Sequence, residues 1–248
     1  MKRIAALLVV GAMLPTAACS SGKSKTVSAA RPVATTTTAP ATAGDQVAAE
    51  RATLKLSDLP SGWTSAPHEN TPDNPGIEKA LADCLHVDVS VFNSQRDTGS
   101  ADSPDFSSPQ DEQVTDSVSF SRTTDEVQSA MNIIRRPTFS SCLGKAMDTA
   151  VSADLKHPSP GSTVPLNVSF GQSSVAQVSF PSLGDQSSAY RITIPISVGS
   201  IQLKVFADLV IAAKGRGAHI LTFIAVGSPF STDLAQLLSR VAVDRLST

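Results

Sequence analysis

The sequence predicts an α+β fold, in which an antiparallel β-sheet meander packs against helices and a C-terminal helix closes the chain. Two observations support this class. Apolar and polar residues alternate through most of residues 175–226, which is typical of half-buried strands. In earlier segments and again after Ser231, apolar residues recur at helical spacing instead. Helix-rich and strand-rich blocks in one chain favour helices that cover one face of a sheet.

The folded region begins with a leucine-rich segment that ends at the single tryptophan. Leu54, Leu56 and Leu59 favour burial, and we expect Trp63 to fill a gap in the core after a Pro/Gly turn. A helix is then expected to begin at Asn74-Pro75. Its apolar positions are Ile77, Ala80, Leu81, Cys84 and Leu85.

Residues 95–116 are rich in serine, proline and aspartate, and no lysine or arginine follows Arg96 within them. Carboxylates bind calcium, but the alternating Asp/Asn loop with its glycine and terminal glutamate is absent. We therefore expect a solvated, mobile acidic loop and no metal site.

Regular structure is expected again at Val114–Phe120, where alternation predicts a half-buried strand with a serine-rich outer face. Thr124 is expected to cap the next helix, because acidic residues follow it in the first turn. A second helix is expected from about Ser140, with Cys142 on its inner face. Three prolines predict a loop at residues 156–165.

Residues 189–226 predict a continuous three-stranded antiparallel meander, with Gly199-Ser200 and Gly215-Arg216 at its two turns. Its third strand, Ile220–Val226, is apolar on both faces, so we expect it at the centre of the sheet under the C-terminal helix. Pro195 lacks an amide hydrogen. The first strand should therefore be an edge at that point, or its nitrogen should face outward.

The N-terminus predicts an export signal that ends at Cys19. Two basic residues precede an apolar stretch, Ile4–Leu14, which is well short of the roughly 20 residues of a spanning helix. Small residues then lead to Cys19, so the segment resembles a bacterial lipobox, with Thr16 where that motif usually has leucine. The resemblance implies that residues 1–18 are a lipoprotein signal peptide and that Cys19 carries acyl chains such as palmitate. The alternative is an ordinary signal peptide that ends near a cysteine.

Residues 19–44 are expected to be a flexible tether. Serine, threonine, alanine and proline dominate them, and no apolar periodicity is present. Such a composition buries too little apolar surface to offset the entropy of ordering. A plain spacer is the simpler interpretation, and an O-glycosylated linker is the alternative. Residues 45–248 are then enough for a single α+β domain.

The folded domain is acidic. The chain has 20 lysines and arginines against 22 aspartates and glutamates, and no acidic residue precedes residue 45. The basic residues before that point are Lys2, Arg3, Lys23, Lys25 and Arg31. An acidic domain lacks the clustered basic residues of nucleic-acid binding, so no such partner is expected. Lipid on Cys19 would have to hold the protein at the outer face of the cytoplasmic membrane.

The predicted domain holds two cysteines, Cys84 and Cys142. An exported domain generally meets an oxidising environment, so a structural disulfide between them is the favoured interpretation. Two free buried thiols are the alternative. Two cysteines without nearby histidines are too few for the usual zinc sites.

Three segments resemble exported actinobacterial sensor-type lipoproteins: Asp58–Trp63, the helix that ends near Phe139–Cys142, and the tail from Gly184 through the Lys214–Gly217 turn. The helix followed by a cysteine resembles extracellular sensor domains of mycobacterial serine/threonine kinases. The strand-and-helix tail is similar to Mog1/PsbP-like lipoprotein domains. This resemblance implies binding of ligands or partners without catalysis, and it transfers no functional residue.

The sequence contains no Gly-x-Ser-x-Gly elbow, no His-Glu-x-x-His and no phosphate-binding loop. Its four histidines, His68, His86, His157 and His219, are expected to be surface or hydrogen-bonded residues rather than catalysts.

The candidate ligand residues are Tyr190, Arg191 and Lys204 on the sheet. A cleft lined by them would hold an anionic or amphipathic ligand, and the alternative for the two cations is a solvated outer face. We therefore predict a membrane-anchored binding or sensing domain without catalysis or cofactor. Its expected partners are the membrane, through the lipid, and an envelope protein or small amphipathic ligand. The alternatives are a cell-envelope hydrolase with an unrecognised site and a structural adaptor for an envelope protein.

Overall fold

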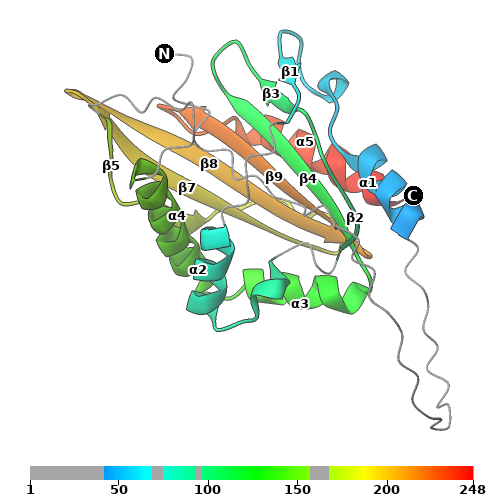
Figure 1. Ribbon diagram of the computed structural model, residues 1–248. Coiled ribbons are helices and arrows are strands. Elements are labelled where there is room, and N and C mark those ends of the chain that lie inside the picture. The colour runs from blue at the N-terminus through cyan, green and yellow to red at the C-terminus, as the bar shows by residue number, and fades with distance from the viewer. Residues whose placement is uncertain (1–41, 69–74, 93–96, 157–167, 248) are drawn as a thin grey trace, which may run out of the picture.

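The computed structural model describes residues 42–68, 75–92, 97–156 and 168–247. Within them the chain forms a nine-stranded antiparallel sheet with helices on both faces (Figure 1). The α+β class is confirmed, although helices cover two faces of the sheet rather than one. The predicted signal peptide, Cys19 and most of the tether lie outside the described residues.

Five α-helices occur in the described parts of the chain. They are α1 (Thr42–Ala52), α2 (Pro75–Leu85), α3 (Thr124–Ile134), α4 (Phe139–Lys156) and α5 (Thr232–Asp244). Three single-turn 3₁₀ helices accompany them, η2 (Leu56–Asp58), η3 (Val89–Val91) and η5 (Arg245–Ser247). None of the described helices has the combined length and apolar character that a membrane crossing requires.

The strands follow the order β1-β3-β4-β9-β8-β7-β5, with β2 also paired to β4 and β6 also paired to β7. The strands before α3 are β1 (Thr64–Ala66), β2 (Asp97–Asp102), β3 (Asp105–Ser107) and β4 (Gln113–Ser121). Those after α4 are β5 (Val168–Phe170), β6 (Ser174–Gln177), β7 (Gln186–Val198), β8 (Ile201–Lys214) and β9 (Gly217–Val226).

The predicted meander is confirmed as β7, β8 and β9. Gly199 and Gly215, which open the two turns, have φ of 61° and 60°, a region that glycine enters without a steric cost. β9 lies between β4 and β8 and is central, as predicted. Two of its apolar residues nevertheless stay exposed, Ile220 at 40% and Val226 at 42%. Pro195 lies opposite the break between β5 and β6, where no ladder partner needs its nitrogen.

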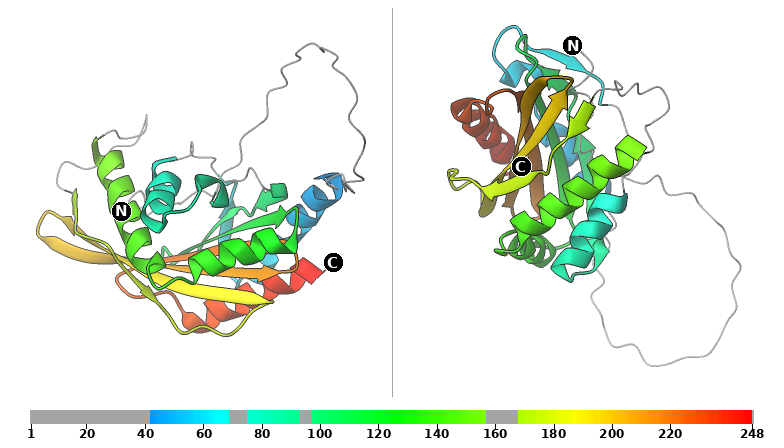
Figure 2. Two further views of the ribbon diagram at one scale, coloured as in Figure 1. Left: turned by 90° about the horizontal axis from the view of Figure 1, so that it is seen from below. Right: turned by 90° about the vertical axis from the view of Figure 1, so that its left-hand side faces the viewer.

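Helices α2, α3 and α4 cover one face of the sheet, and Figure 2 shows them as a layer. The core beneath them is built from alternate residues of the meander. Its largest cluster joins Leu81, Phe139, Leu143, Met147, Ile192, Ile194 and Ile224. The alternation of apolar residues in the sequence therefore predicted correctly which meander side chains are buried on this face.

The opposite face packs against α5 and α1. Leu221 and Phe223 of β9 are fully buried there against Leu238 of α5, which confirms the predicted contact with the C-terminal helix. Trp63 packs edge-on against Phe230, with ring centroids 6.2 Å apart, and is partly buried against this core.

The expectation of a mobile acidic loop at residues 95–116 is wrong. Its described part, residues 97–116, contains β2, β3 and the start of β4, and Phe106 within it is fully buried. The cause is a tertiary contact, because the Gln46 side chain of α1 bonds both the N–H and the C=O of Ser100. α1 thus satisfies a strand edge that would otherwise face water.

Three local expectations also need correction. The cap of α3 is Thr123 rather than Thr124, because Glu126 completes a capping box with Thr123. Leu56 is 42% exposed, since it begins a 3₁₀ turn on the surface, whereas Leu54 and Leu59 are buried. The last residues assigned to the tether, 42–44, already belong to α1. Apart from Lys156 at the end of α4, the predicted loop at 156–165 lies outside the described residues.

Candidate functional site

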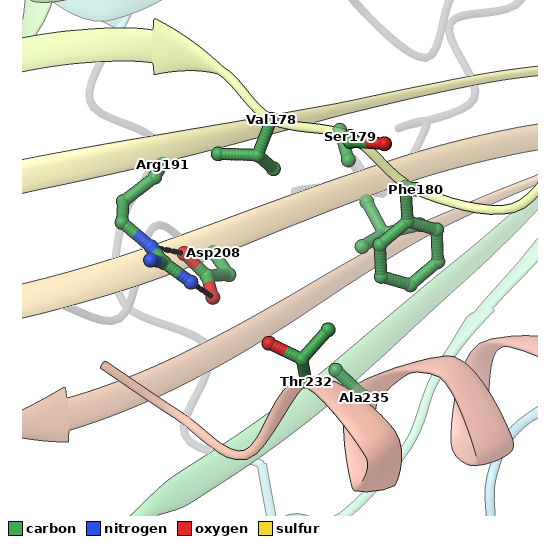
Figure 3. A pocket seen from close by; sticks show the side chains of 9 residues that line it. Val178, Ser179, Phe180, Arg191, Asp208, Thr232 and Ala235 are labelled. Carbon is green, nitrogen blue, oxygen red and sulfur yellow. Dashed lines mark hydrogen bonds and ion pairs between the residues drawn. The ribbon is translucent and has the colours of Figure 1, made fainter.

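A pocket of about 180 Å³ lies on the α5 side of the sheet, where β7 and β8 pass beside the first turn of α5 (Figure 3). The segment 178–180 forms one wall, and Thr232 and Ala235 of α5 form the opposite wall. β7 and β8 supply Ala189, Arg191, Asp208 and Val210. We call this cavity the Arg191 pocket.

A bidentate ion pair between Arg191 and Asp208 occupies the sheet side of the pocket. The two residues face each other across the β7–β8 ladder. Arg191 donates from Nε to Oδ1 of Asp208 at 2.6 Å and from Nη2 to Oδ2 at 2.7 Å. Their side chains are 27% and 9% exposed. The hydrogen bond to Asp208 raises the pKa of Arg191 above its usual value, and the pair joins groups of opposite charge.

The pair does not use all the hydrogen-bonding capacity of the two groups. Among the described residues, none accepts a hydrogen bond from Nη1 of Arg191. Each carboxylate oxygen of Asp208 has further lone-pair capacity after its bond to the guanidinium. Arg191 therefore keeps a donor that no described residue uses, and Asp208 keeps the capacity to accept further hydrogen bonds.

The walls are mostly apolar. Val178 is held in place because its N–H donates to the carbonyl of Ala189 at 2.9 Å, which extends the sheet edge beyond β6. Val178 and Phe180 are half-buried and line the pocket. Ala189, Val210 and Ala235 are buried behind them. This lining suits an apolar body placed over one polar spot.

The α5 wall is fixed by the start of its helix. Ser231 caps α5 by accepting a hydrogen bond from the N–H of Leu234 at 3.4 Å, and its carbonyl accepts from Ala235 at 2.9 Å. Thr232 and Ala235 project from this first turn toward the sheet (Figure 3). Both walls are thus anchored by backbone hydrogen bonds.

The structure separates the three candidate ligand residues. Arg191 lines the pocket. Tyr190 points to the other face, where it is buried and its hydroxyl donates to the carbonyl of Ile134 at 2.6 Å. Neighbours in a strand point to opposite faces, so Tyr190 and Arg191 cannot share one cleft. Lys204 pairs with Pro195 on the Arg191 side, but it is exposed and lies outside the pocket.

Asp208 lines the pocket and pairs with Arg191, but it was not among the candidate residues predicted from the sequence. A signal for it existed, because a two-residue turn at Gly199-Ser200 sets the β7–β8 register and places position 208 opposite Arg191. An aspartate in an otherwise apolar stretch of β8, aligned with an arginine of β7, predicts a cross-strand ion pair.

A disulfide joins Cys84 of α2 to Cys142 of α4, with the two Cα atoms 5.6 Å apart. The predicted pairing is therefore the one in the structure. It links two helices on the face opposite the Arg191 pocket and contributes no group to that pocket.

Two histidines form pairs with aspartates. His219 and Asp116 are fully buried, with Nδ1 and Oδ1 2.7 Å apart, and Asp116 also accepts from the N–H of Leu54. Nδ1 of His68 lies 2.6 Å from Oδ1 of Asp105. His86 follows α2 with a positive φ of 54°, and His157 lies outside the described residues. The described part of the chain contains no cluster of three or more His, Cys, Asp or Glu side chains that would hold a metal ion.

Comparisons with known proteins found distant structural similarity. No protein-family model matches the chain, and no curated protein matches it. Among solved structures, the extracellular domain of PknH from Mycobacterium tuberculosis aligns with a TM-score of 0.43 and 12% sequence identity. The alignment covers 81% of this chain and 95% of that domain. At this level the similarity carries no conclusion about function, and the lipoprotein, sensor-type and Mog1/PsbP-like assignments stay predictions.

Proposed function

We propose that this chain is an extracytoplasmic binding protein that acyl chains on Cys19 hold at the membrane, and that it binds a small ligand in the Arg191 pocket. Catalysis forms no part of the proposal. The histidines near carboxylates, His68 and His219, lie outside the pocket lining, which contains neither histidine nor cysteine.

The ion pair in the pocket carries the binding proposal. Burying two charges is expensive, and apolar residues of similar volume often serve stability as well or better. Asp208 is nevertheless only 9% exposed, in a pocket with mostly apolar walls. Recognition of a polar group on a ligand would explain why a charged pair lies at this position. It would also explain why Nη1 of Arg191 has no acceptor among the described residues.

Two observations support export. The N-terminal segment has the order of a secretory signal that ends at Cys19. Independently, Cys84 and Cys142 form a disulfide, a bond that persists mainly in oxidising compartments. The tether that follows Cys19 would let the domain stand clear of the lipid surface.

Fractionation of cells tests the anchor. Because the apolar stretch before Cys19 is too short to span, Cys19→Ala should move the protein from the membrane fraction to the soluble exported fraction. Ser20→Ala is the matched control, since it changes the neighbouring residue and keeps the thiol. A Cys19→Ala protein that stays as firmly bound as the control would contradict lipid anchoring.

Mass spectrometry of native material tests binding. Protein isolated without denaturation should carry a co-purifying small molecule, and Ala235→Leu, which adds bulk to the α5 wall, should release it. Lys204→Ala, on the same face but outside the pocket, should retain it. Equal retention by both variants would place the bound molecule elsewhere.

A second candidate function is an adaptor for another envelope protein. The tip of the β7–β8 hairpin exposes Ile201 at 58% and Leu203 at 37%, and exposed apolar groups mark interaction surfaces when they gather in a patch. A photo-crosslinker at Ile201 should then capture one discrete partner in intact cells, while one at Asp244, on the surface of α5, should not. Equal labelling at both positions would argue against an adaptor.

A further inference from the structure

We propose that α1 covers a self-complementary strand edge on β2, and that two copies of this chain pair through their β2 strands when α1 is displaced. This surface is the outer edge of β2, and none of its residues lines the Arg191 pocket. Three features lead to the proposal: the way Gln46 occupies the edge, the apolar residues that α1 covers beside it, and the charge pattern of β2.

Gln46 occupies the β2 edge in the way that a neighbouring strand would. β4 pairs with one side of β2, and no other described strand pairs with it. On the other side, the N–H of Ser100 donates to Oε1 of Gln46 at 3.2 Å, and the carbonyl of Ser100 accepts from Nε2 at 2.9 Å. Opposite residues in an antiparallel ladder exchange the same two bonds through their backbones. Displacement of α1 would therefore leave an edge that is able to pair with a strand.

α1 also covers apolar residues near this edge. Ala49 and Ala52 of α1 are buried in one cluster with Val118, Phe120 and Leu246. Displacement of α1 would expose the last three side chains close to the unpaired backbone groups of β2. Apolar surface beside an open strand edge favours association with another chain.

The charge pattern of β2 allows a second copy to pair in one register. Antiparallel pairing about a two-fold axis at Ser100 joins this residue to its equivalent, and each supplies the N–H and C=O that α1 now satisfies. Asp102 of one copy then lies near Thr98 of the other copy, whose hydroxyl loses its Asp45 acceptor when α1 leaves. A register shifted by one residue would place Asp102 opposite Asp97, and like charges directly opposite are destabilising. The register about Ser100 therefore fits a second copy without carboxylates in contact.

Displacement of α1 in the full chain, purified in detergent, tests the pairing. Gln46→Ala with Ala49→Glu removes the bonds to Ser100 and places a charge at a fully buried position, so α1 should detach. We call this variant the opened chain. Native mass spectrometry should find it as a dimer and the parent as a monomer, and hydrogen exchange of the α1 amides verifies the detachment. Val47→Glu is the matched control, because it adds the same charge on the exposed side of α1.

A cysteine at the two-fold axis tests the register. Opposite residues in a hydrogen-bonded antiparallel pair have Cα atoms about 5.5 Å apart, which lies within the range of a disulfide. Ser100→Cys in the opened chain should therefore form an intermolecular disulfide on mild oxidation, with at least about ten times the yield of Ser100→Cys in the parent, where α1 blocks the contact. Asp102→Cys is the control, because its two copies would lie about 14 Å apart along the strands, too far to bridge.

The size of the assembly and the position of the disulfide together decide between β2 pairing and other contacts. Dimers that cross-link at position 100 and not at position 102 support the proposal. An opened chain that stays monomeric although its α1 amides exchange freely overturns it. Dimers that do not cross-link at position 100 also overturn it, because another surface, or exchange of α1 between copies, would then hold them. Equal cross-linking of the parent and the opened chain would show that α1 does not cover the edge.

A second variant displaces α1 without a change in α1 itself. A Cβ at Gly99 would lie 2.3 Å from the carbonyl carbon of Asp45, so Gly99→Ala should force α1 away from β2. If the opened chain does not fold, the same assembly and cross-linking measurements on Gly99→Ala decide between the same outcomes.

Discussion

Asp45 and Arg216, 171 positions apart in the chain, form a bidentate ion pair that fastens α1 to the β8–β9 turn. The distances are 2.7 Å between Nη2 and Oδ1 and 2.9 Å between Nη1 and Oδ2. Arg216 also donates to the carbonyl of Ser121 at 2.8 Å, and the hydroxyl of Thr98 bonds to Asp45. The ion pair therefore joins four segments, and the side chain of Asp45 is 9% exposed whereas that of Arg216 is 37% exposed.

Removing this carboxylate should loosen α1. Asp45→Ala leaves Arg216 and Thr98 without their shared partner, so the free energy of unfolding should fall by about 1.5–3 kcal/mol, as expected for hydrogen bonds to charged groups. Urea denaturation measures the loss. Asp244→Asn, an exposed change on α5, should stay close to the parent. An Asp45→Ala protein as stable as this control would show that the pair contributes nothing.

Asp45 also predicts a dependence on pH. The hydrogen bond from Arg216 lowers the pKa of Asp45 below 3.8. A lowered pKa means that the stabilisation is present above about pH 4 and is lost as the pH falls through the folded-state pKa. Between pH 5 and pH 3 the parent should therefore lose more stability than Asp45→Asn does. Parallel losses in the two proteins over this range would contradict the assignment.

Gly99 of β2 permits the close approach of α1. A Cβ at this position would lie 2.3 Å from the carbonyl carbon of Asp45 and 2.4 Å from the nitrogen of Gln46. Gly99→Ala should therefore displace α1 and speed hydrogen exchange of the α1 amides. The free energy of unfolding should fall by about 1–3 kcal/mol or more. Gly44→Ala is the matched control, because nothing lies within 4 Å of its Cβ. Unchanged exchange in Gly99→Ala would refute the contact.

The disulfide should be a main contributor to stability. It closes a loop of 58 residues between Cys84 and Cys142, for which the chain-entropy model gives roughly 4 kcal/mol. The double change of both cysteines to serine should lower the free energy of unfolding by about that amount. Reduction of the parent should reproduce the loss. Two alkylatable thiols in folded, non-reduced protein would disprove the bond.

Asp97 should make the stability of the fold depend on pH in the opposite direction from Asp45. Burial, with a contribution from nearby Glu126, raises the pKa of Asp97 to about 7. Because its unfolded value is 3.8, the folded state holds the proton more tightly, and stability falls as the pH rises from about 4 to 7. Asp97→Asn should therefore gain stability over the parent at pH 8, by at most about 4 kcal/mol, and little at pH 4.

Asp111→Asn is the matched control for that measurement. Asp111 is exposed and has a φ of 63°, which asparagine tolerates well. Its difference from the parent should be the same at both pH values. A gain in Asp97→Asn that did not change between pH 4 and pH 8 would contradict the raised pKa.

Much of the fold was predictable because local patterns decide it. Alternation from Tyr190 onward and glycine at positions 199 and 215 determine the strands, the turns and the register of the meander. The same alternation puts Arg191 and Tyr190 on opposite faces of β7. Asp208 follows from that register only when the two strands are aligned explicitly, since position 208 read alone is one acidic residue in an apolar run.

Residues 95–116 show where local patterns are insufficient. Their serines and aspartates favour loops in isolation. The strands form because Gln46 and Asp45 of α1, far away in the chain, bond to Ser100 and Thr98. Asp116 is buried for a similar reason, as His219 of β9 and the amide of Leu54 satisfy it. Such partners are not visible in composition.

The position of α1 has a mechanical consequence. Arg216 holds it at the opposite end of β8 from the β7–β8 turn, and Arg245 of η5 bonds the carbonyl of Thr53 just beyond it. A pulling force on the chain before α1 therefore loads these bonds ahead of the long ladders of the meander. Detachment and unwinding of the 11 residues of α1 would add roughly 20 Å of reach. Under a pulling force, α1 would unwind and lengthen the chain while the rest of the domain stays folded.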